Sequence, residues 1–278
     1  MKKGIIKRLF TLVICISMFA SNLSVVQAKE ATTMEEMKSY LLSIGTPEYV
    51  LDTYGNIESL KMLYERVYKP EGNVSFAGAT AILEDGTKIN SISGIDSASL
   101  NKAELIIAYY MDTQSTPERL ITKVYANINY KNNHLDNNYK IMKDLVAINW
   151  DPSVFVYKSN SLSYWCETPF GNVGQGSTLT VSEQGGIGWK TNRPDIDISH
   201  YNGHAICELL PRTYNIYWPN NSKGYTMHLT SINGEYGWSE IPFGIGFSVA
   251  NGMVSIDAGI LLSDTVAASQ LVGYYTKN

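Results

Sequence analysis

The chain has few charged residues and few cysteines, and it lacks the short motifs typical of common enzymes. Charged residues make up 17% of its 278 residues, and only 3 residues are cysteine. It contains no Gly-x-Ser-x-Gly, no His-Glu-x-x-His and no glycine pattern of the Walker or dinucleotide-binding type. These absences remove the usual sequence support for a serine hydrolase, a zinc peptidase or a nucleotide-binding enzyme. No catalytic motif is left, and we lean toward a protein that is not an enzyme.

Long apolar runs are also scarce. The one clear run, Leu9–Ala20, follows the positively charged segment Lys2–Arg8 and precedes Val26-Gln27-Ala28, which has small residues at the −3 and −1 positions of a cleavage site. This run is shorter than the about 20 apolar residues that span a bilayer. Residues 1–28 are therefore predicted to be a cleaved signal peptide, and the product to be secreted and extracellular. We expect no transmembrane segment after signal removal.

Positive charge becomes scarce once the signal peptide is removed. Residues 1–28 hold four Lys and Arg and no acids, so 18 Lys and Arg then face 26 Asp and Glu, a net charge of −8. An acidic chain has no excess of positive charge with which to neutralise phosphates. We therefore expect no nucleic-acid partner.

Two cysteines, Cys166 and Cys207, lie outside the signal peptide. Export favours pairing, and both lie in runs that read as strands. In the chain-entropy model, the loop closed by a disulfide between them would stabilise the fold by about 4 kcal/mol. We predict this disulfide; the alternative is two buried free thiols.

Residues 29–72 read as a small helical segment. Thr33 and Glu36 form a capping-box pair, Gly45 is placed to end the first helix, Thr46 is expected to cap the second and Asn56 the third. Three helices in such a short segment bury too little to be stable alone. We expect them to dock on the rest of the chain.

Residues 73–278 read as one antiparallel β-sandwich domain. Glu84–Thr87 is a hairpin turn signal. The run Leu105–Met111 is apolar on both faces, whereas Val124–Tyr130 alternates as in a half-buried strand. Short strands continue to the C-terminus without helices between them. The predicted fold class is α+β, with a three-helix segment before a jelly-roll-like β-sandwich.

The helical segment with its Gly45–Glu48 turn, together with the run Asp144–Asp151, resembles uncharacterised secreted proteins of Gram-positive bacteria. The resemblance covers most of the exported chain as an arrangement, but only about thirty residues as motifs. It implies export and a helical segment followed by a β-rich domain. The resemblance implies no activity and no functional residues for this chain.

A seven-residue pattern occurs twice. Residues 165–171 and 238–244 share Trp, Glu, Pro, Phe and Gly at five of seven positions, 73 residues apart. In one interpretation the aromatic residues fill a core from equivalent strands. In the other, Trp165 and Trp238 lie on a surface with Glu167 and Glu240 and bind sugar rings or a protein. We favour the interpretation in which the repeat is structural. If it binds a ligand, these four residues are the candidates.

The segment from Asp195 to His204 concentrates two acids and two imidazoles. On a helix, His200 and His204 would share a face and could hold zinc, whereas Asp195 and Asp197 could hold calcium. Third and fourth ligands at a recognised spacing are missing. We favour a polar loop with its tip at Asn202-Gly203, and we expect no cofactor, with calcium and zinc left open.

Three classes of function remain. The first is a secreted, non-enzymatic protein that binds a cell-wall polymer or an extracellular protein, for which 19 Tyr and 5 Trp provide surface. The second is a pore-forming toxin or bacteriocin-like factor, through the weakly charged stretch Phe243–Ala268. The third is a wall-glycan hydrolase that uses Glu167 with Glu240, or Asp144 with Asp151. We favour the first class.

Overall fold

The structure of the chain is a computed structural model. It describes residues 33–69, 73–90, 103–133, 143–168, 171–172, 177–192, 200–218, 224–239, 245–258 and 263–278. The predicted signal peptide lies outside these ranges, as do Asp195, Asp197 and Glu240. None of the described helices is long and apolar enough to span a lipid bilayer.

The N-terminal helices begin and end largely where local chemistry predicts. Helix α2 (Met34–Ser43) starts with the expected capping box: Glu36 N donates to Thr33 Oγ1 (3.2 Å), and Thr33 N donates to Glu36 Oε2 (2.8 Å). It ends at Gly45, whose φ of +95° is the left-handed conformation that glycine adopts at a helix C-terminus. Helix α4 (Ile57–Val67) is capped by Asn56, which accepts from Ser59 N (3.0 Å).

The expectation that Thr46 caps the second helix is wrong. Helix α3 (Glu48–Leu51) starts after Pro47 and has no side-chain cap. Thr46 instead belongs to the turn that closes α2, because its N–H donates to Leu41 O (3.0 Å) while Gly45 N donates to Leu42 O (3.0 Å). The C-terminal turn of one helix thus uses the residue that would have capped the next.

The strands form two large antiparallel sheets and one hairpin. Sheet A has eight strands in the order β2-β1-β3-β4-β11-β7-β8, with β6 beside β11, and sheet B has five in the order β15-β12-β5-β10-β9. The strands of sheet A are β1 (Val74–Leu83), β2 (Lys88–Asn90), β3 (Ala103–Thr113), β4 (Ile121–Asn132), β6 (Phe155–Tyr157), β7 (Ser163–Thr168), β8 (Gly171–Asn172) and β11 (Tyr201–Pro211). Those of sheet B are β5 (Lys143–Trp150), β9 (Ser177–Glu183), β10 (Gly186–Asn192), β12 (Tyr225–Ser239) and β15 (Ser263–Lys277), and the hairpin is β13 (Gly246–Ala250) with β14 (Met253–Asp257).

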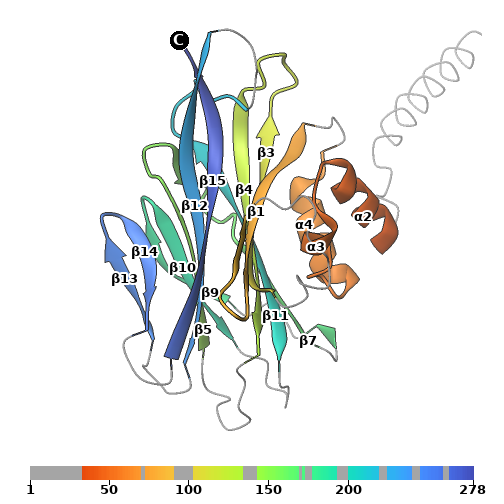
Figure 1. The fold of residues 1–278 in the computed structure, drawn as a ribbon, viewed down its shortest axis with the longest axis vertical. Coiled ribbons are helices and arrows are strands. Elements are labelled where there is room, and N and C mark those ends of the chain that lie inside the picture. Colours follow the sequence, from red (N-terminus) through yellow and green to blue (C-terminus); the bar gives the residue numbers. More distant parts are fainter. Residues whose placement is uncertain are drawn as a thin grey trace, which may run out of the picture.

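The layers stack in the order helices, sheet A, sheet B, hairpin (Figure 1). The helices cover the outer face of sheet A, and β13–β14 lies over the outer face of sheet B. The predicted β-sandwich with an N-terminal helical segment is confirmed. The turn at Gly86 is also confirmed, because Gly86 N donates to Leu83 O (2.8 Å) and Gly86 has a φ of +80°.

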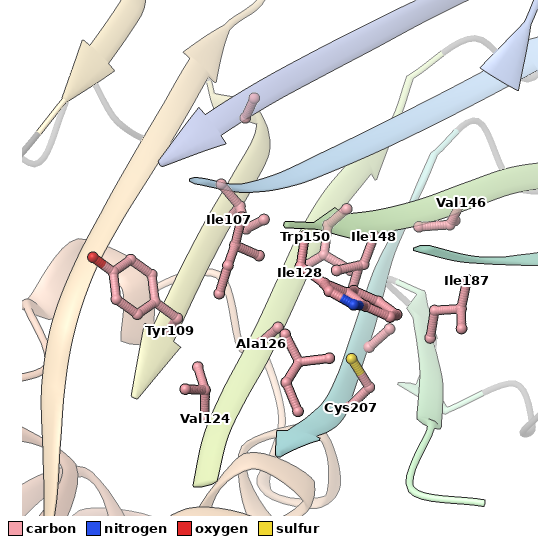
Figure 2. Packing of buried hydrophobic residues seen from close by; sticks show 14 of the residues in the cluster. Ile107, Tyr109, Val124, Ala126, Ile128, Val146, Ile148, Trp150, Ile187 and Cys207 are labelled. Atoms are coloured by element: carbon pink, nitrogen blue, oxygen red, sulfur yellow. The ribbon is translucent and has the colours of Figure 1, made fainter. Parts of the chain in front are cut away.

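The main core lies between the two sheets. Figure 2 shows Ile107 and Ile128 of sheet A pointing toward Val146, Ile148 and Ile187 of sheet B. These five side chains are at most 1% exposed. Burying an aliphatic side chain of this size contributes about 1.5–3 kcal/mol, so this layer supplies most of the hydrophobic stabilisation.

A second core lies between the helices and sheet A, and it corrects the half-buried assignment of β4. Val124, Ile128 and Tyr130 face the inter-sheet core as expected. The opposite face is also buried, since Tyr125 contacts the helical cluster and Asn127 is 0% exposed. The alternation of apolar and polar residues predicts one face toward the core and one face toward solvent. In the structure the docked helices cover the polar face.

Candidate functional site

The two copies of the repeat occupy different environments. The first lies on β7 in sheet A, and the described part of the second lies on β12 in sheet B. Trp165 is half-buried on the outer side, whereas Trp238 is 7% exposed and stacks on Tyr236 in the main core (5.4 Å between ring centroids). The expectation that both tryptophans share one role or one surface is therefore corrected.

Strand alternation explains the difference between the copies. Side chains alternate between faces with a period of two. In the first copy the core-facing tyrosine, Tyr164, comes one residue before Trp165, so the two point to opposite faces. In the second copy Tyr236 comes two residues before Trp238, so both face the core. The offset of the preceding tyrosine is the sequence signal that separates the copies.

Glu167 lies on the outer face of sheet A, beneath the turn between α3 and α4. Its side chain is 3% exposed. Its carboxylate accepts hydrogen bonds from Gly55 N (2.8 Å), Asn56 Nδ2 (2.7 Å) and Ser59 Oγ (2.6 Å) of the helical segment. Asn202 Nδ2 of β11 donates to it as well (3.2 Å). Glu167 thus joins the helices to the sheet and is not a surface carboxylate.

His204, the partner of Glu167, belongs to a chain of buried side-chain hydrogen bonds. Asn127 Nδ2 donates to the backbone oxygen of Ala205 (3.0 Å), so its Oδ1 is the atom that accepts from Asn129 Nδ2 (3.1 Å). Asn129 Oδ1 is then left to accept from His204 Nδ1 (3.0 Å). His204 Nε2 lies 3.4 Å from Glu167 Oε1. His204 Nδ1 thus contacts Asn129, and Nε2 points toward the Glu167 carboxylate.

The electrostatics of Glu167 follow from these contacts. Burial by itself raises the pKa of the Glu167 carboxyl, but the hydrogen bond and charge of His204, with the donors Ser59 and Gly55, outweigh burial and lower the pKa to about 2. A second carboxylate, Glu208, is in a similar situation. Burial raises its pKa, and Lys158 (2.7 Å) and Lys123 (3.0 Å) outweigh burial and lower the pKa to about 2.

These two carboxyls predict a loss of stability in acid. Their pKa values lie below the ordinary value when folded, so their contribution is present above about pH 4.5 and is lost as pH falls toward 2. For the buried Glu167 this amounts to about 3 kcal/mol. The lysine contacts of Glu208 are partly exposed, so its smaller share should shrink in high salt. Urea midpoints measured from pH 7 to pH 2.5 test this, and an equally steep loss in Glu167→Gln would contradict it.

The metal candidates do not assemble into a site among the residues that the structure describes. Asp195 and Asp197 lie outside them. His204 is on β11 with its side chain fully buried, and His200 comes just before that strand. Asn202 and Gly203, expected at the tip of a loop, lie within β11. Within the described ranges, no three His, Cys, Asp or Glu side chains lie close enough together to hold a metal ion.

The predicted disulfide is wrong, because both described cysteines are free and buried. Cys166 lies opposite Gly203 in the register of β7 and β11, and Cys207 is four residues farther along β11. Four residues of a strand extend about 13 Å, far beyond the about 7 Å between Cα atoms that a disulfide allows. Burial raises the pKa of both thiols to about 12, so neither is a reactive thiolate at neutral pH.

A thiol measurement tests this directly. In denaturant, the chain from residue 29 should react with two equivalents of dithionitrobenzoate without prior reduction, because Cys166 and Cys207 are free. When the protein is folded, both thiols should react slowly, since they are buried. Adding dithiothreitol should leave the urea midpoint unchanged. A midpoint that falls on reduction would restore the disulfide.

The carboxylate pair Asp144 and Asp151 does not fit a glycoside hydrolase. Asp144 is 0% exposed and accepts hydrogen bonds from Asn132 Nδ2 (2.8 Å), Tyr236 OH (3.2 Å) and the hydroxyl of Tyr201. Asp151 lies seven residues later, just beyond the end of β5. Seven residues of strand span about 23 Å, whereas a glycosidase acid and base lie about 5–9.5 Å apart. This pairing is excluded by distance.

The stretch proposed for pore formation divides between two described elements. The β13–β14 hairpin packs Val254 and Ile256 onto Leu145 and Ala147 of β5. Residues 263–268 pair with β12 as the first part of β15. Because the remaining residues lie outside the described ranges, the pore hypothesis stays a prediction.

An open groove of about 800 Å³ lies between α4 and β7, and Trp165 forms part of its wall. Met62 and Leu162 add apolar surface, and charged side chains of α4 line the groove. Asn202 lines two smaller hollows, of about 390 and 260 Å³. Glu167 borders the first and His204 the second. The groove is larger than either hollow, and Trp165, a binding candidate predicted from the sequence, forms part of its wall.

No protein-family model matches the chain, and no curated protein matches it by sequence. Among solved structures, it resembles the collagen-binding subdomain of the Enterococcus faecalis surface protein ACE, with 7% identity, a TM-score of 0.28, and coverage of 56% of this chain and 88% of that one. It also resembles the T6 backbone pilin of Streptococcus pyogenes, with 8% identity, a TM-score of 0.35, and coverage of 67% of this chain and 50% of the pilin. The group B streptococcus pilus 2b backbone protein gives 12% identity, a TM-score of 0.32, and coverage of 50% and 53%.

These three similar structures are one collagen-binding subdomain of a bacterial surface protein and two pilus backbone proteins. The chain spans about half the length of the two pilins. With TM-scores below 0.5, the similarities support no inference about a partner or a binding site. That inference has to come from the groove itself.

Proposed function

We propose that this chain is a secreted, non-enzymatic protein that binds an extracellular partner, a cell-wall polymer or a protein, through the groove between α4 and β7. The observation that carries the proposal is Trp165, a large aromatic side chain left half-buried in the wall of an open groove of about 800 Å³. Tryptophan is enriched among the residues that dominate binding energy. Secretion rests on the predicted signal peptide.

The groove offers both apolar and charged contacts to a partner. Trp165, Met62 and Leu162 provide apolar surface, and Lys61, Glu65 and other charged residues of α4 surround it. Lys61 and Glu65 form an exposed pair at 3.9 Å. An exposed pair of this kind contributes little to stability, so both side chains can turn toward a ligand at small cost.

The environment of Glu167 supports binding over catalysis. Its carboxylate already accepts four hydrogen bonds and faces His204, all within the protein. A general acid or base must reach the substrate within hydrogen-bond distance. In this proposal Glu167 therefore holds the helices against the strand that carries Trp165, and Trp165 contacts the partner.

Co-sedimentation with Gram-positive cell walls tests the proposal. We expect the chain from residue 29 to pellet saturably with the walls, and Trp165→Ala to bind about 30-fold more weakly, as for a residue that contributes about 2 kcal/mol. Tyr214→Ala is the matched control, because Tyr214 is 92% exposed and lies outside the groove. Urea unfolding of both variants confirms that they are folded.

Protease treatment of the walls separates the two kinds of partner. Binding that survives removal of wall proteins identifies a polymer, and binding that disappears identifies a protein. Wild-type protein that stays in the supernatant with both preparations would contradict the proposal. Equal pelleting of wild type and Trp165→Ala would place the site elsewhere.

A further inference from the structure

Strand β9 is the edge strand of sheet B, and it lies next to the groove. It pairs with β10 along Ser177–Glu183, and the structure describes no strand on its other side. Six of its seven residues are exposed, including Leu179 at 44%. Ser177, its first residue, lines the groove that contains Trp165. Within the described part of the chain, the backbone N–H and C=O groups on the outer edge of β9 therefore have no strand partner, and this edge runs up to the proposed binding groove.

The other sheet edges in the described structure are short or occupied. On sheet A, β2 has three residues and begins with exposed Lys88, and β8 has two residues. On sheet B, β15 is the opposite edge, and sheet A covers it: Thr80 Oγ1 donates to Ser269 O (3.2 Å) and Tyr109 OH to Leu271 O (2.6 Å). Short strands, charge and covering contacts are the usual protection of sheet edges.

β9 is longer than the edge strands of sheet A, and its protection is limited to an irregular register with β10 at Thr180, where Thr180 Oγ1 donates to Thr178 O (2.9 Å). It contains no Lys and no Pro, and its single charged residue, Glu183, is the last one. Threonine, valine and leucine favour the extended conformation. Among the described residues, contacts join the two sheets along β1 and β15, whereas β9 has no strand beyond it.

We propose that β9 binds an extended segment of a protein partner, which adds to sheet B as a further strand and places a side chain in the groove against Trp165. This proposal rests on the proposed function of the groove and names the chemistry of its partner. The edge itself selects the ligand class, because its donors and acceptors repeat at the spacing of another extended polypeptide. A polysaccharide has no matching row of N–H donors.

The structure also indicates how β9 and the groove would recognise such a segment. Backbone pairing with β9 supplies affinity that does not depend on sequence, and the groove supplies selectivity at the Ser177 end. Since Trp165, Met62 and Leu162 line the groove, the segment should carry an apolar or aromatic residue there. A second copy of this chain, pairing edge to edge through β9, is the rival occupant.

Random linear peptides displayed on phage, selected against the chain from residue 29, provide the probe. Selected peptides are synthesised, and their affinities are measured by calorimetry before and after N-methylation of each backbone amide in turn. We expect affinity to fall about tenfold or more at every second amide and to change little at the amides between. This alternation is specific to strand addition, because only one set of amides faces the edge.

Two protein variants locate the peptide. Leu179→Lys places a charge on the edge, and Thr180→Pro removes a backbone N–H at the one β9 residue without a partner in the β10 register. Both should weaken peptide binding about tenfold or more. Leu229→Lys, at a leucine of β12 that is even more exposed (60%), should leave it unchanged. The N-methylated peptides need no variant, so the test holds even if Thr180→Pro fails to fold.

Several outcomes would overturn the proposal. The selection could enrich no peptide, or N-methylation could weaken binding equally at every amide. Peptide binding could also be unaffected by both Leu179→Lys and Trp165→Ala. A concentration-dependent dimer in light scattering that Leu179→Lys abolishes would assign the edge to a second copy. If Trp165→Ala abolishes wall binding while the peptide test fails, the groove keeps its function and only the peptide class is lost.

Discussion

Replacing Glu167 by Gln should destabilise the protein by about 3–5 kcal/mol, the usual cost of removing one member of a buried ion pair. The glutamine has one carbonyl oxygen for the donors of Gly55, Asn56 and Ser59, and its NH₂ group adds a donor where only donors converge. The ring of His204 would lose its carboxylate neighbour at 3.4 Å. Urea unfolding at pH 7 measures the loss.

The same variant should loosen the helical segment before the sandwich. Glu167 is the carboxylate to which the α3–α4 turn is bonded, so digestion within residues 33–69 should be faster in Glu167→Gln than in wild type. Glu118→Gln is the matched control, because Glu118 forms only an exposed pair with Lys277 (2.8 Å). Its effect should stay within about 0.5 kcal/mol. Equal urea midpoints for Glu167→Gln and wild type would remove Glu167 from its anchoring role.

A double-mutant cycle isolates the ion pair from the other hydrogen bonds. Glu167→Gln combined with His204→Gln should be less destabilised than the sum of the two single variants, because the two side chains contact each other and each single change removes the same contact. Strict additivity would show that the 3.4 Å contact between the two side chains carries no coupling.

Replacing Gly203 by Ala should cost about 3 kcal/mol or more, although it adds a single methyl group. Gly203 lies opposite Tyr130 in the register of β11 and β4, and a Cβ there would overlap the tyrosine ring. Overpacked cores usually lose about 1–3 kcal/mol, and more when the neighbours cannot move. Here the ring stacks on Tyr236 (4.1 Å between centroids), and its hydroxyl is bonded to Tyr164 OH (2.9 Å).

Gly246→Ala tests whether the effect at Gly203 is local. A Cβ at Gly246, also in a strand, meets nothing within 4 Å. We expect its unfolding free energy to change by less than about 0.5 kcal/mol. If Gly203→Ala unfolds at the same urea concentration as Gly246→Ala, the Tyr130 ring has room to move and the steric argument fails.

The elements that the sequence predicted well depend on contacts between residues close in the chain. The Thr33–Glu36 capping box, the Asn56 cap and the turn at Gly86 each involve residues within four positions. Strand periodicity likewise identified β4 from its own residues. Such features depend on local backbone geometry, so the sequence carries their signal directly.

The candidate site could be predicted only in part. The repeat predicts Trp165 as a binding candidate, and Trp165 forms part of the groove wall. Its repeat partner Trp238 entered the core, because one residue of offset from the preceding tyrosine reverses the face of a strand. The anchoring role of Glu167 had no sequence signal, since its donor Asn56 lies 111 residues away.

The sequence alone therefore determined the local elements of this protein: helix caps, the Gly86 turn, the strand pattern and the predicted export signal. The tertiary structure decided the environment of each side chain. Pairing register holds Cys166 and Cys207 too far apart to bond, and helix docking covers a polar strand face and buries Glu167 against His204. Register and docking are set by contacts between distant segments, and no short stretch of sequence contains both partners of such a contact.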